Sequence, residues 1–133
     1  MPPLPYPDAT FGAIYGVSVL THLTESVQFA WLAELRRLAK PGAPVVVSVH
    51  NDFVAFHTAQ GSPQVGAEFE TRGISDGMHD DNLGPKLKEK SYYRATFHSR
   101  RYILENWTRE FEILKIYTCA NGATQDFVVM RPK

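Results

Sequence analysis

The 133-residue sequence lacks most of the features that mark several common classes of protein. Cys119 is its single cysteine, so an internal disulfide and a cysteine zinc cluster are excluded, and a free thiol suits a reducing compartment. The 14 basic and 14 acidic residues form no long blocks, which argues against nucleic acid and membrane surfaces as partners. No apolar run approaches the roughly 18 residues of a membrane span, and the proline-rich start lacks the regions of a signal peptide. The expected location is the cytoplasm.

Nucleotide-binding and hydrolase motifs are missing as well. The nine glycines form neither G-x-G-x-x-G nor a P-loop, so no dinucleotide or nucleotide cradle is encoded. Residues 16–18 (GVS) match half of a nucleophile elbow, but Leu20 stands where the second glycine is needed. Residues 79–81 (HDD) are metal-ligand types, yet adjacent side chains do not converge easily on one ion. The sequence therefore predicts a solvated loop at 79–81 and no metal site.

A strand, a helix and a second strand are predicted between residues 13 and 50. Residues 13–20 (AIYGVSVL) are apolar on both faces, which is typical of a strand in a parallel sheet, and so are residues 44–51 (PVVVSVHN). Thr24 is a suitable helix N-cap, and Pro41-Gly42 ends the helix. Its apolar stripe contains Leu23, Val27, Trp31, Leu35 and Leu38. Its predicted outward face contains Glu34, Arg36, Arg37 and Lys40. Together these segments form a right-handed βαβ unit.

The remaining segments complete a single predicted α/β domain. Residues 1–12 are rich in proline and predict an arm and a turn. Residues 51–92 have no clean period, which predicts a loop region with one short helix at most. Residues 93–133 predict a helix with Ser99 as its N-cap, followed by an antiparallel hairpin that turns at Asn121-Gly122.

Two short segments are candidates for a binding site. Ser18 to His22 and His50 to Asp52 each follow a predicted parallel strand, at the sheet edge where open α/β sheets bind ligands. Both histidines have a structural alternative, because His22 could hydrogen-bond the start of its helix and His50 could simply end its strand.

These segments together resemble the class I S-adenosylmethionine-dependent methyltransferases, in particular the small-molecule, type 11/12-like branch. Residues 4–23 (LPYPDATFGAIYGVSVLTHL) look like the family's turn, fourth strand and strand-end S/T-x-H-L. Residues 31–50 (WLAELRRLAKPGAPVVVSVH) are similar to its helix ending in R-x-LKPGG and its fifth strand. Residues 96–116 and 125–132 (QDFVVMRP) resemble its last helix and closing antiparallel hairpin. Two positions depart from the family pattern: Gly12 replaces an Asp, and Ala43 replaces the second glycine of PGG.

The resemblance implies a partial Rossmann-like methyltransferase sheet. It would contain two parallel strands with a crossover helix, then a helix and a C-terminal antiparallel hairpin. The family's first three strands, which carry the glycine-rich cofactor loop and two cofactor-binding acids, would precede Met1. The expectation is a fold truncated by gene decay, by the choice of ends or by division across chains.

The implied activity is methyl transfer from S-adenosylmethionine to a small-molecule acceptor, once the missing half is supplied. By resemblance, the residues that line the methionine end of the cofactor are Ser18, Val19, Leu20 and Thr21. His22 would lie near the transferred methyl as a base. The implied substrate-binding residues are His50, Asn51, Tyr92 and Tyr93, with residues 51–92 as a roof. The two tyrosines have packing as their alternative role.

A second interpretation is a catalytically inactive remnant that acts as a dimeric interaction module. In the family fold the first strand pairs with the strand at 13–20, so here one edge of that strand would lack its partner. We expect a two-fold homodimer in which this strand meets its own copy, or in which the arm of one chain covers the other. We also expect the isolated chain to bind S-adenosylmethionine poorly.

Overall fold

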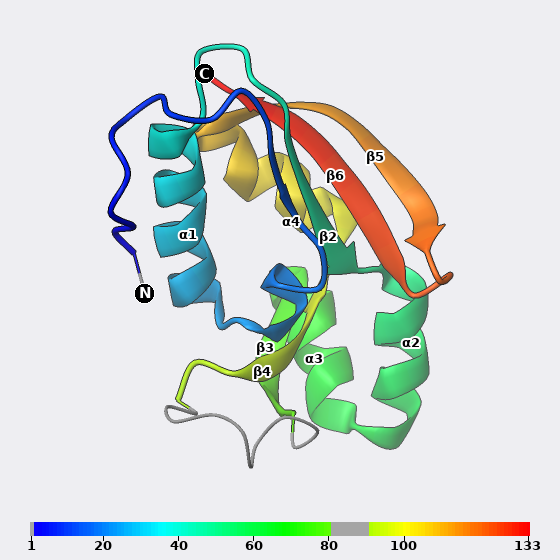
Figure 1. The fold of residues 1–133 in the computed structure, drawn as a ribbon. Coiled ribbons are helices and arrows are strands. Elements are labelled where there is room, and N and C mark those ends of the chain that lie inside the picture. Colours follow the sequence, from blue (N-terminus) through cyan, green and yellow to red (C-terminus); the bar gives the residue numbers. More distant parts are fainter. Residues whose placement is uncertain (1, 81–90) are drawn as a thin grey trace.

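In the computed structural model, which describes residues 2–80 and 91–133, the fold is built around strand β2 (Val45–His50). The other strands are β1 (Ile14–Gly16), β3 (Ile74–His79), β4 (Arg94–His98), β5 (Phe111–Asn121) and β6 (Gln125–Pro132). They form one six-stranded mixed sheet in the order β3-β4-β2-β6-β5, with β1 also joined to β2 (Figure 1). β6 runs antiparallel along one edge of β2, while β1 and β4 run parallel to it along the other edge. The predicted fold class, with its parallel pair and its C-terminal hairpin, is confirmed.

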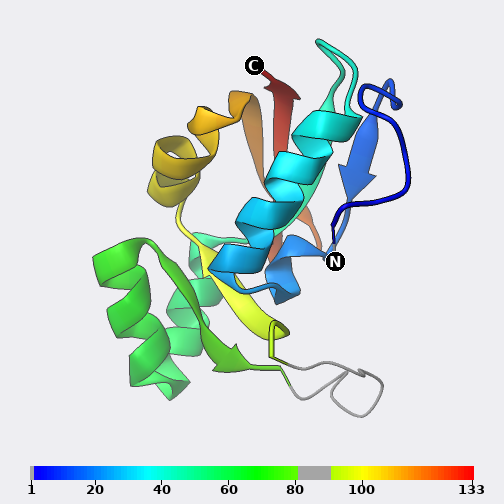
Figure 2. The ribbon, with the colours of Figure 1, turned by 90° about the vertical axis from the view of Figure 1, so that its left-hand side faces the viewer.

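Two helices cover one face of the central strands. The helical elements are η1 (Leu20–His22), α1 (Glu25–Leu38), α2 (Asp52–Gly61), α3 (Pro63–Arg72), α4 (Arg100–Asn106) and η3 (Trp107–Arg109). Figure 2 shows α1 and α4 on the same side of the strands. The main buried cluster contains Val45, Val47, Val49, Val128, Met130, Leu32, Ile103 and Trp107. Val46 and Val129 alternate with these residues along β2 and β6, so their side chains lie on the opposite face of the sheet. The two valines are cross-strand partners, and both are only half-buried. No helix in the described residues is long and apolar enough to span a membrane.

The strand predicted at 13–20 is shorter than expected. β1 ends at Gly16, and the chain then bends into η1. Ser18 has a φ of 55°, outside the extended region, and its N–H donates to the Ser48 hydroxyl at 2.7 Å instead of continuing the ladder. The sequence cannot show this bend, because the partner of the Ser18 N–H lies on a different strand.

The predicted outward position of Glu34 is wrong. Glu34 is only 5% exposed because the N-terminal arm packs on this part of α1. The Leu4 N–H donates to Glu34 Oε1 at 2.7 Å, and Arg37 donates to both Glu34 and Asp8 at 2.7 Å. Hydrogen bonds from Arg37 and Leu4 lower the pKa of the Glu34 carboxyl to about 2. The arm therefore lies along its own chain.

The start of α1 is capped by a distant residue. Thr24 occupies the N-cap position, but its side chain makes no capping hydrogen bond. The Glu25 N–H donates instead to Asp76 of β3 at 2.8 Å, and Arg72 bridges Asp76 and Glu25. The predicted Ser99 cap of α4 is confirmed, since the Tyr102 N–H donates to the Ser99 hydroxyl at 3.1 Å.

The loop region predicted at 51–92 is largely regular in the residues that the structure describes. It contains α2, α3 and β3, so the prediction of one short helix at most is wrong. Each helix has only ten residues and buries a narrow stripe, with Ala55 and Val65 against Phe97 of β4. Such short apolar stripes leave no clear period in the sequence, and tertiary contacts with β4 stabilise them.

Gly73, which ends α3, gives a stability prediction with an internal control. Gly73 and Gly42 both have a φ of 75°, so Gly→Ala at either site adds left-handed strain of about 1–2 kcal/mol. A Cβ at Gly73 would also lie 2.7 Å from the Ser99 hydroxyl and 3.1 Å from Tyr102 Cβ, whereas nothing lies within 4 Å at Gly42. In urea unfolding we expect Gly73→Ala to lose about 3 kcal/mol or more and Gly42→Ala about 1 kcal/mol. Equal losses would contradict this account.

Candidate functional site

The carboxyl ends of β1 and β2 bring two histidines together. Because both strands run in the same direction, the segments that follow them emerge at one edge of the sheet, above α2 and α3 in Figure 1. η1 places His22 there, and β2 ends at His50. The two imidazole rings are 6.1 Å apart between centroids and meet edge to face at 83°. The structure thus joins the predicted base to one predicted substrate-binding residue.

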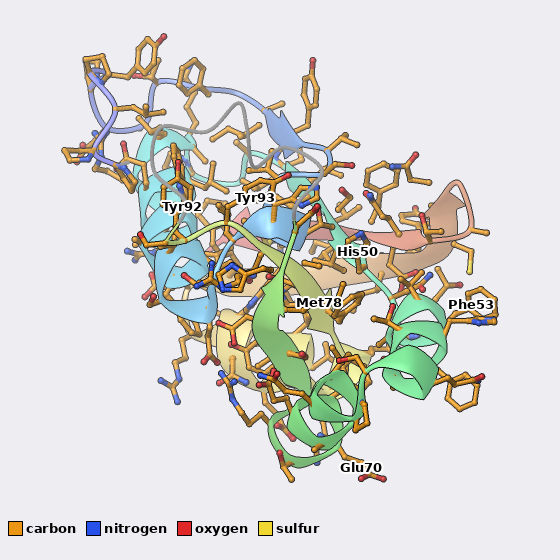
Figure 3. All side chains as sticks on the ribbon, turned by 90° about the horizontal axis from the view of Figure 1, so that it is seen from below. His50, Phe53, Glu70, Met78, Tyr92 and Tyr93 are labelled. Atoms are coloured by element: carbon orange, nitrogen blue, oxygen red, sulfur yellow. The ribbon has the colours of Figure 1, made fainter. Side chains whose placement is uncertain are left out.

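A cavity of about 490 Å³ opens beside these histidines. Its lining residues are His22, His50, Val54, Thr58, Met78, His79, Asp80, Ala95 and Phe97. They come from η1, β2, α2, β3 and β4, and from the residue after β3. Figure 3 views this side from below, with Tyr93, Met78 and His50 near its centre and with Phe53 and Glu70 pointing outward. We call this space the histidine cavity.

His22 is held in the histidine cavity by two neighbours. Its Nδ1 lies 3.1 Å from Asp80 Oδ2, and its ring stacks on Tyr93 with 4.9 Å between centroids and 7° between planes. The prediction of a solvated loop is therefore wrong for Asp80, whose side chain is 10% exposed, while Asp81 lies outside the described residues. Sequence reasoning missed Asp80 because the pairing of β3 with β4 places it beside η1.

His50 is anchored by the neighbouring strand. Its Nδ1 lies 3.0 Å from the Thr96 carbonyl oxygen, and its ring packs on Phe97 with 5.3 Å between centroids. Burial lowers the pKa of the His50 imidazole, and the nearby His22 acts in the same direction. His50 is therefore a neutral imidazole at neutral pH, facing the cavity.

The four predicted cofactor-binding residues do not share one environment. Leu20 and Thr21 are buried, with exposures of 2% and 0%, whereas Val19 is 46% exposed. The Ser18 hydroxyl accepts a hydrogen bond from the Gln125 side-chain amide at 2.9 Å, so it is not paired with an imidazole base. A cofactor beside this segment would meet the side chains of Ser18 and Val19, and only the backbone of Leu20 and Thr21.

Asn51 and Tyr92 make hydrogen bonds and packing contacts that stabilise the fold. Asn51 is 5% exposed, its oxygen caps α2 by accepting from the Val54 N–H, and its amide donates to Asp126 Oδ1 at 3.0 Å. Tyr92 packs against the main core, and its carbonyl accepts from the Thr24 N–H at 3.0 Å. Neither residue lines the histidine cavity.

Tyr93 supports the His22 ring from behind and has a buried hydroxyl. Its hydroxyl has no hydrogen-bond partner within residues 2–80 and 91–133, and burial together with the Asp80 charge raises its pKa. The same part of the chain contains no group of three or more His, Cys, Asp or Glu side chains arranged to hold a metal ion. The polar residues that line the cavity, among them His22, His50 and Asp80, are groups that can take part in hydrogen bonding and proton transfer.

Comparison with known proteins supports the fold assignment. No family model and no curated protein matches the chain. A solved structure of an S-adenosylmethionine-dependent methyltransferase from Methanosarcina mazei is 15% identical, with a TM-score of 0.61. The PH0226 protein from Pyrococcus horikoshii OT3 is 14% identical, with a TM-score of 0.60.

Both alignments cover nearly all of this chain and part of the other. They include 98% of this chain, but 63% of the Methanosarcina chain and 56% of the Pyrococcus chain. At these identities the likeness concerns the fold. The chain therefore has a partial Rossmann-like α/β fold of the kind seen in the methyltransferase from Methanosarcina mazei.

Proposed function

We propose that the chain provides the acceptor side of an S-adenosylmethionine-dependent methyltransferase that modifies a small molecule. The observation that carries the proposal is the histidine cavity, which lies at the carboxyl edge of the parallel strands in this fold, next to residues 18–22. Ligands of open α/β sheets bind at that edge. Because the chain matches little more than half of its structural neighbours, the groups that grip the rest of the cofactor would come from another segment or chain.

The residues of the chain would bind and orient the acceptor. S-adenosylmethionine, when bound, supplies an electrophilic methyl group. Val54, Met78 and Phe97 provide apolar walls that would hold the acceptor and exclude water. Positioning of this kind supplies much of the acceleration in a displacement reaction, and a base is required when the attacking group is weakly acidic. His22 and His50, which lie at the strand ends, would take part in that proton transfer.

The proposal predicts weak but localised binding of S-adenosylmethionine by the isolated chain. Ser18 and Val19 are the accessible side chains among the four predicted cofactor-binding residues, so we expect a dissociation constant weaker than about 10 μM in calorimetry. At high cofactor concentration, amide chemical shifts should change at residues 18–22 and remain constant in α4. Shift changes confined to α4 or to the β5–β6 hairpin would contradict the proposal, as would tight binding.

A dimeric interaction module is the second candidate function, and β1 is the observation that favours it. Within the part of the chain that the structure describes, β2 is the only strand paired with β1. Tyr15 is 82% exposed and Val17 is 46% exposed. An apolar cavity of about 250 Å³ beside β1 is lined in part by Trp31 and Leu35. A strand edge next to an apolar surface of this kind tends to recruit another chain.

A further inference from the structure

We propose that His50, rather than His22, is the proton acceptor of the histidine cavity, and that its substrate class is a small uncharged ring bearing a weakly acidic O–H group. This inference rests on the proposed function, because it assigns the base and the acceptor chemistry of the same site.

The hydrogen bond to Thr96 fixes the tautomer of His50. A carbonyl oxygen can only accept, so the Nδ1 that lies 3.0 Å from the Thr96 oxygen must carry the proton. In the neutral ring, Nε2 then has a free lone pair. The ring lines the histidine cavity, so this lone pair is available there as a proton acceptor. A backbone carbonyl thus orients His50 as a base.

His22 has a different environment. Its Nδ1 lies beside the carboxylate of Asp80, and one face of its ring stacks on Tyr93. The Asp80 carboxylate oxygen lies 3.1 Å from His22 Nδ1, whereas His50 Nδ1 donates to a neutral carbonyl oxygen, which leaves Nε2 of His50 as an acceptor. His50 is the member of the pair that is held ready to receive a proton.

One part of the cavity wall is apolar and suits an uncharged ring. Phe97 stacks against the His50 ring, and Val54, Met78 and Ala95 complete this apolar wall, while Thr58, His79 and Asp80 line the rest of the cavity. A phenol-like ring would pack against Val54 and Met78, with its hydroxyl in the plane of the imidazole and donating to Nε2. In the proton transfer, the O–H bond of the acceptor breaks, its electrons remain on oxygen, and an N–H bond forms at Nε2. The imidazolium later releases that proton to water.

The tautomer can be measured directly by long-range ¹H–¹⁵N NMR of the histidine rings in the purified chain. We expect His50 to be Nδ1-protonated at pH 7.5. Titration with phenol should give a dissociation constant near 1 mM and shift the His50 Nε2 resonance, because Nε2 receives the hydrogen bond. His50→Gln should weaken phenol binding about five-fold or more. His57→Gln, at an exposed position of α2, should leave phenol binding unchanged.

Several results would overturn the assignment. An Nε2-protonated His50 would remove its lone pair from the cavity. Phenol binding that perturbs His22 Nε2 but leaves His50 Nε2 unchanged would return the base role to His22. No phenol binding at about 10 mM would reject the acceptor class. The proposed function is tested separately, by mapping S-adenosylmethionine binding to residues 18–22. A negative result there would count against the methyltransferase proposal, whereas the tautomer and phenol measurements test the His50 assignment.

The pKa of the His50 imidazole should reflect its burial and the titratable groups around it. The titratable groups that face it are His22 from η1, His79 and Asp80 at the end of β3, and His98 from β4. The ring carbon shifts of His50 should titrate below the ordinary range of a histidine side chain, because burial lowers the pKa of its imidazole. A His50 that titrates within that ordinary range would contradict the buried, carbonyl-anchored setting.

Discussion

Acidification from about pH 6.5 to pH 3 should reduce the free energy of unfolding strongly, because His98 is buried in its neutral form. His98 is 1% exposed, and its Nε2 donates to Gln28 Oε1 at 2.7 Å. The Gln28 amide in turn donates to the Leu20 and Leu23 carbonyls, which fixes the direction of this hydrogen bond. His98 Nδ1 is left buried without a hydrogen-bond partner in the described residues. A proton on Nδ1 would therefore be unfavourable.

The size of the effect follows from the proton uptake of the two states. Burial lowers the pKa of the His98 imidazole from 6.5 to about 3. Between these values the unfolded chain binds a proton that the folded chain does not, so stability falls as the pH falls. The slope approaches about 1.4 kcal/mol per pH unit. The lowered pKa values of His50 and Glu34 act in the same direction.

Urea unfolding at pH 7, 6, 5 and 4 measures this slope. His98→Gln should be less stable than the parent at pH 7, because it disturbs the hydrogen bond to Gln28, but its stability should depend less on pH. His57→Gln removes an exposed histidine and should keep the parental slope. If His98→Gln retained that slope too, the buried neutral imidazole would not be the cause.

Sedimentation equilibrium should give a mass of about 30 kDa, twice the 15.0 kDa of one chain, if β1 pairs with its copy. The arm is hydrogen-bonded to Glu34 and Arg37 of its own chain, so self-pairing of β1 is the arrangement we propose. Antiparallel pairing about a two-fold axis would satisfy the open edge of both copies. It would cover Tyr15 and bury on the order of 1,000 Å² or more in total.

A charge on β1 provides the test of this interface. Tyr15→Lys should shift the population to monomer or insoluble protein, because a lysine at the interface would be desolvated without a partner. Ala67→Lys adds the same charge at an exposed position of α3 and should leave the mass unchanged. A mass near one chain at tens of micromolar for the parent protein would refute the dimer.

The local chemistry of the sequence was sufficient to predict several elements. The helical period before Pro41-Gly42, the apolar run at 44–50 and the turn at Asn121-Gly122 all depend on neighbouring residues, and all are present in the structure. The Ser99 cap is equally local, because its hydroxyl meets a backbone N–H three residues along. The placement of His22 and His50 at strand ends followed from the same reasoning, since parallel strands share one carboxyl edge.

Only the tertiary structure decided how the site is built. Glu34 looked exposed from its helical position and is buried because the arm covers it. Asp76 caps α1 and Asp80 meets His22 because β3 pairs with β4. The Thr96 carbonyl, which is far from His50 in the sequence, determines that Nδ1 of His50 carries the ring proton. Periodicity and capping report contacts within a few residues, whereas these partners are joined by strand pairing, so their distances, pKa shifts and tautomers arise only when the chain has folded.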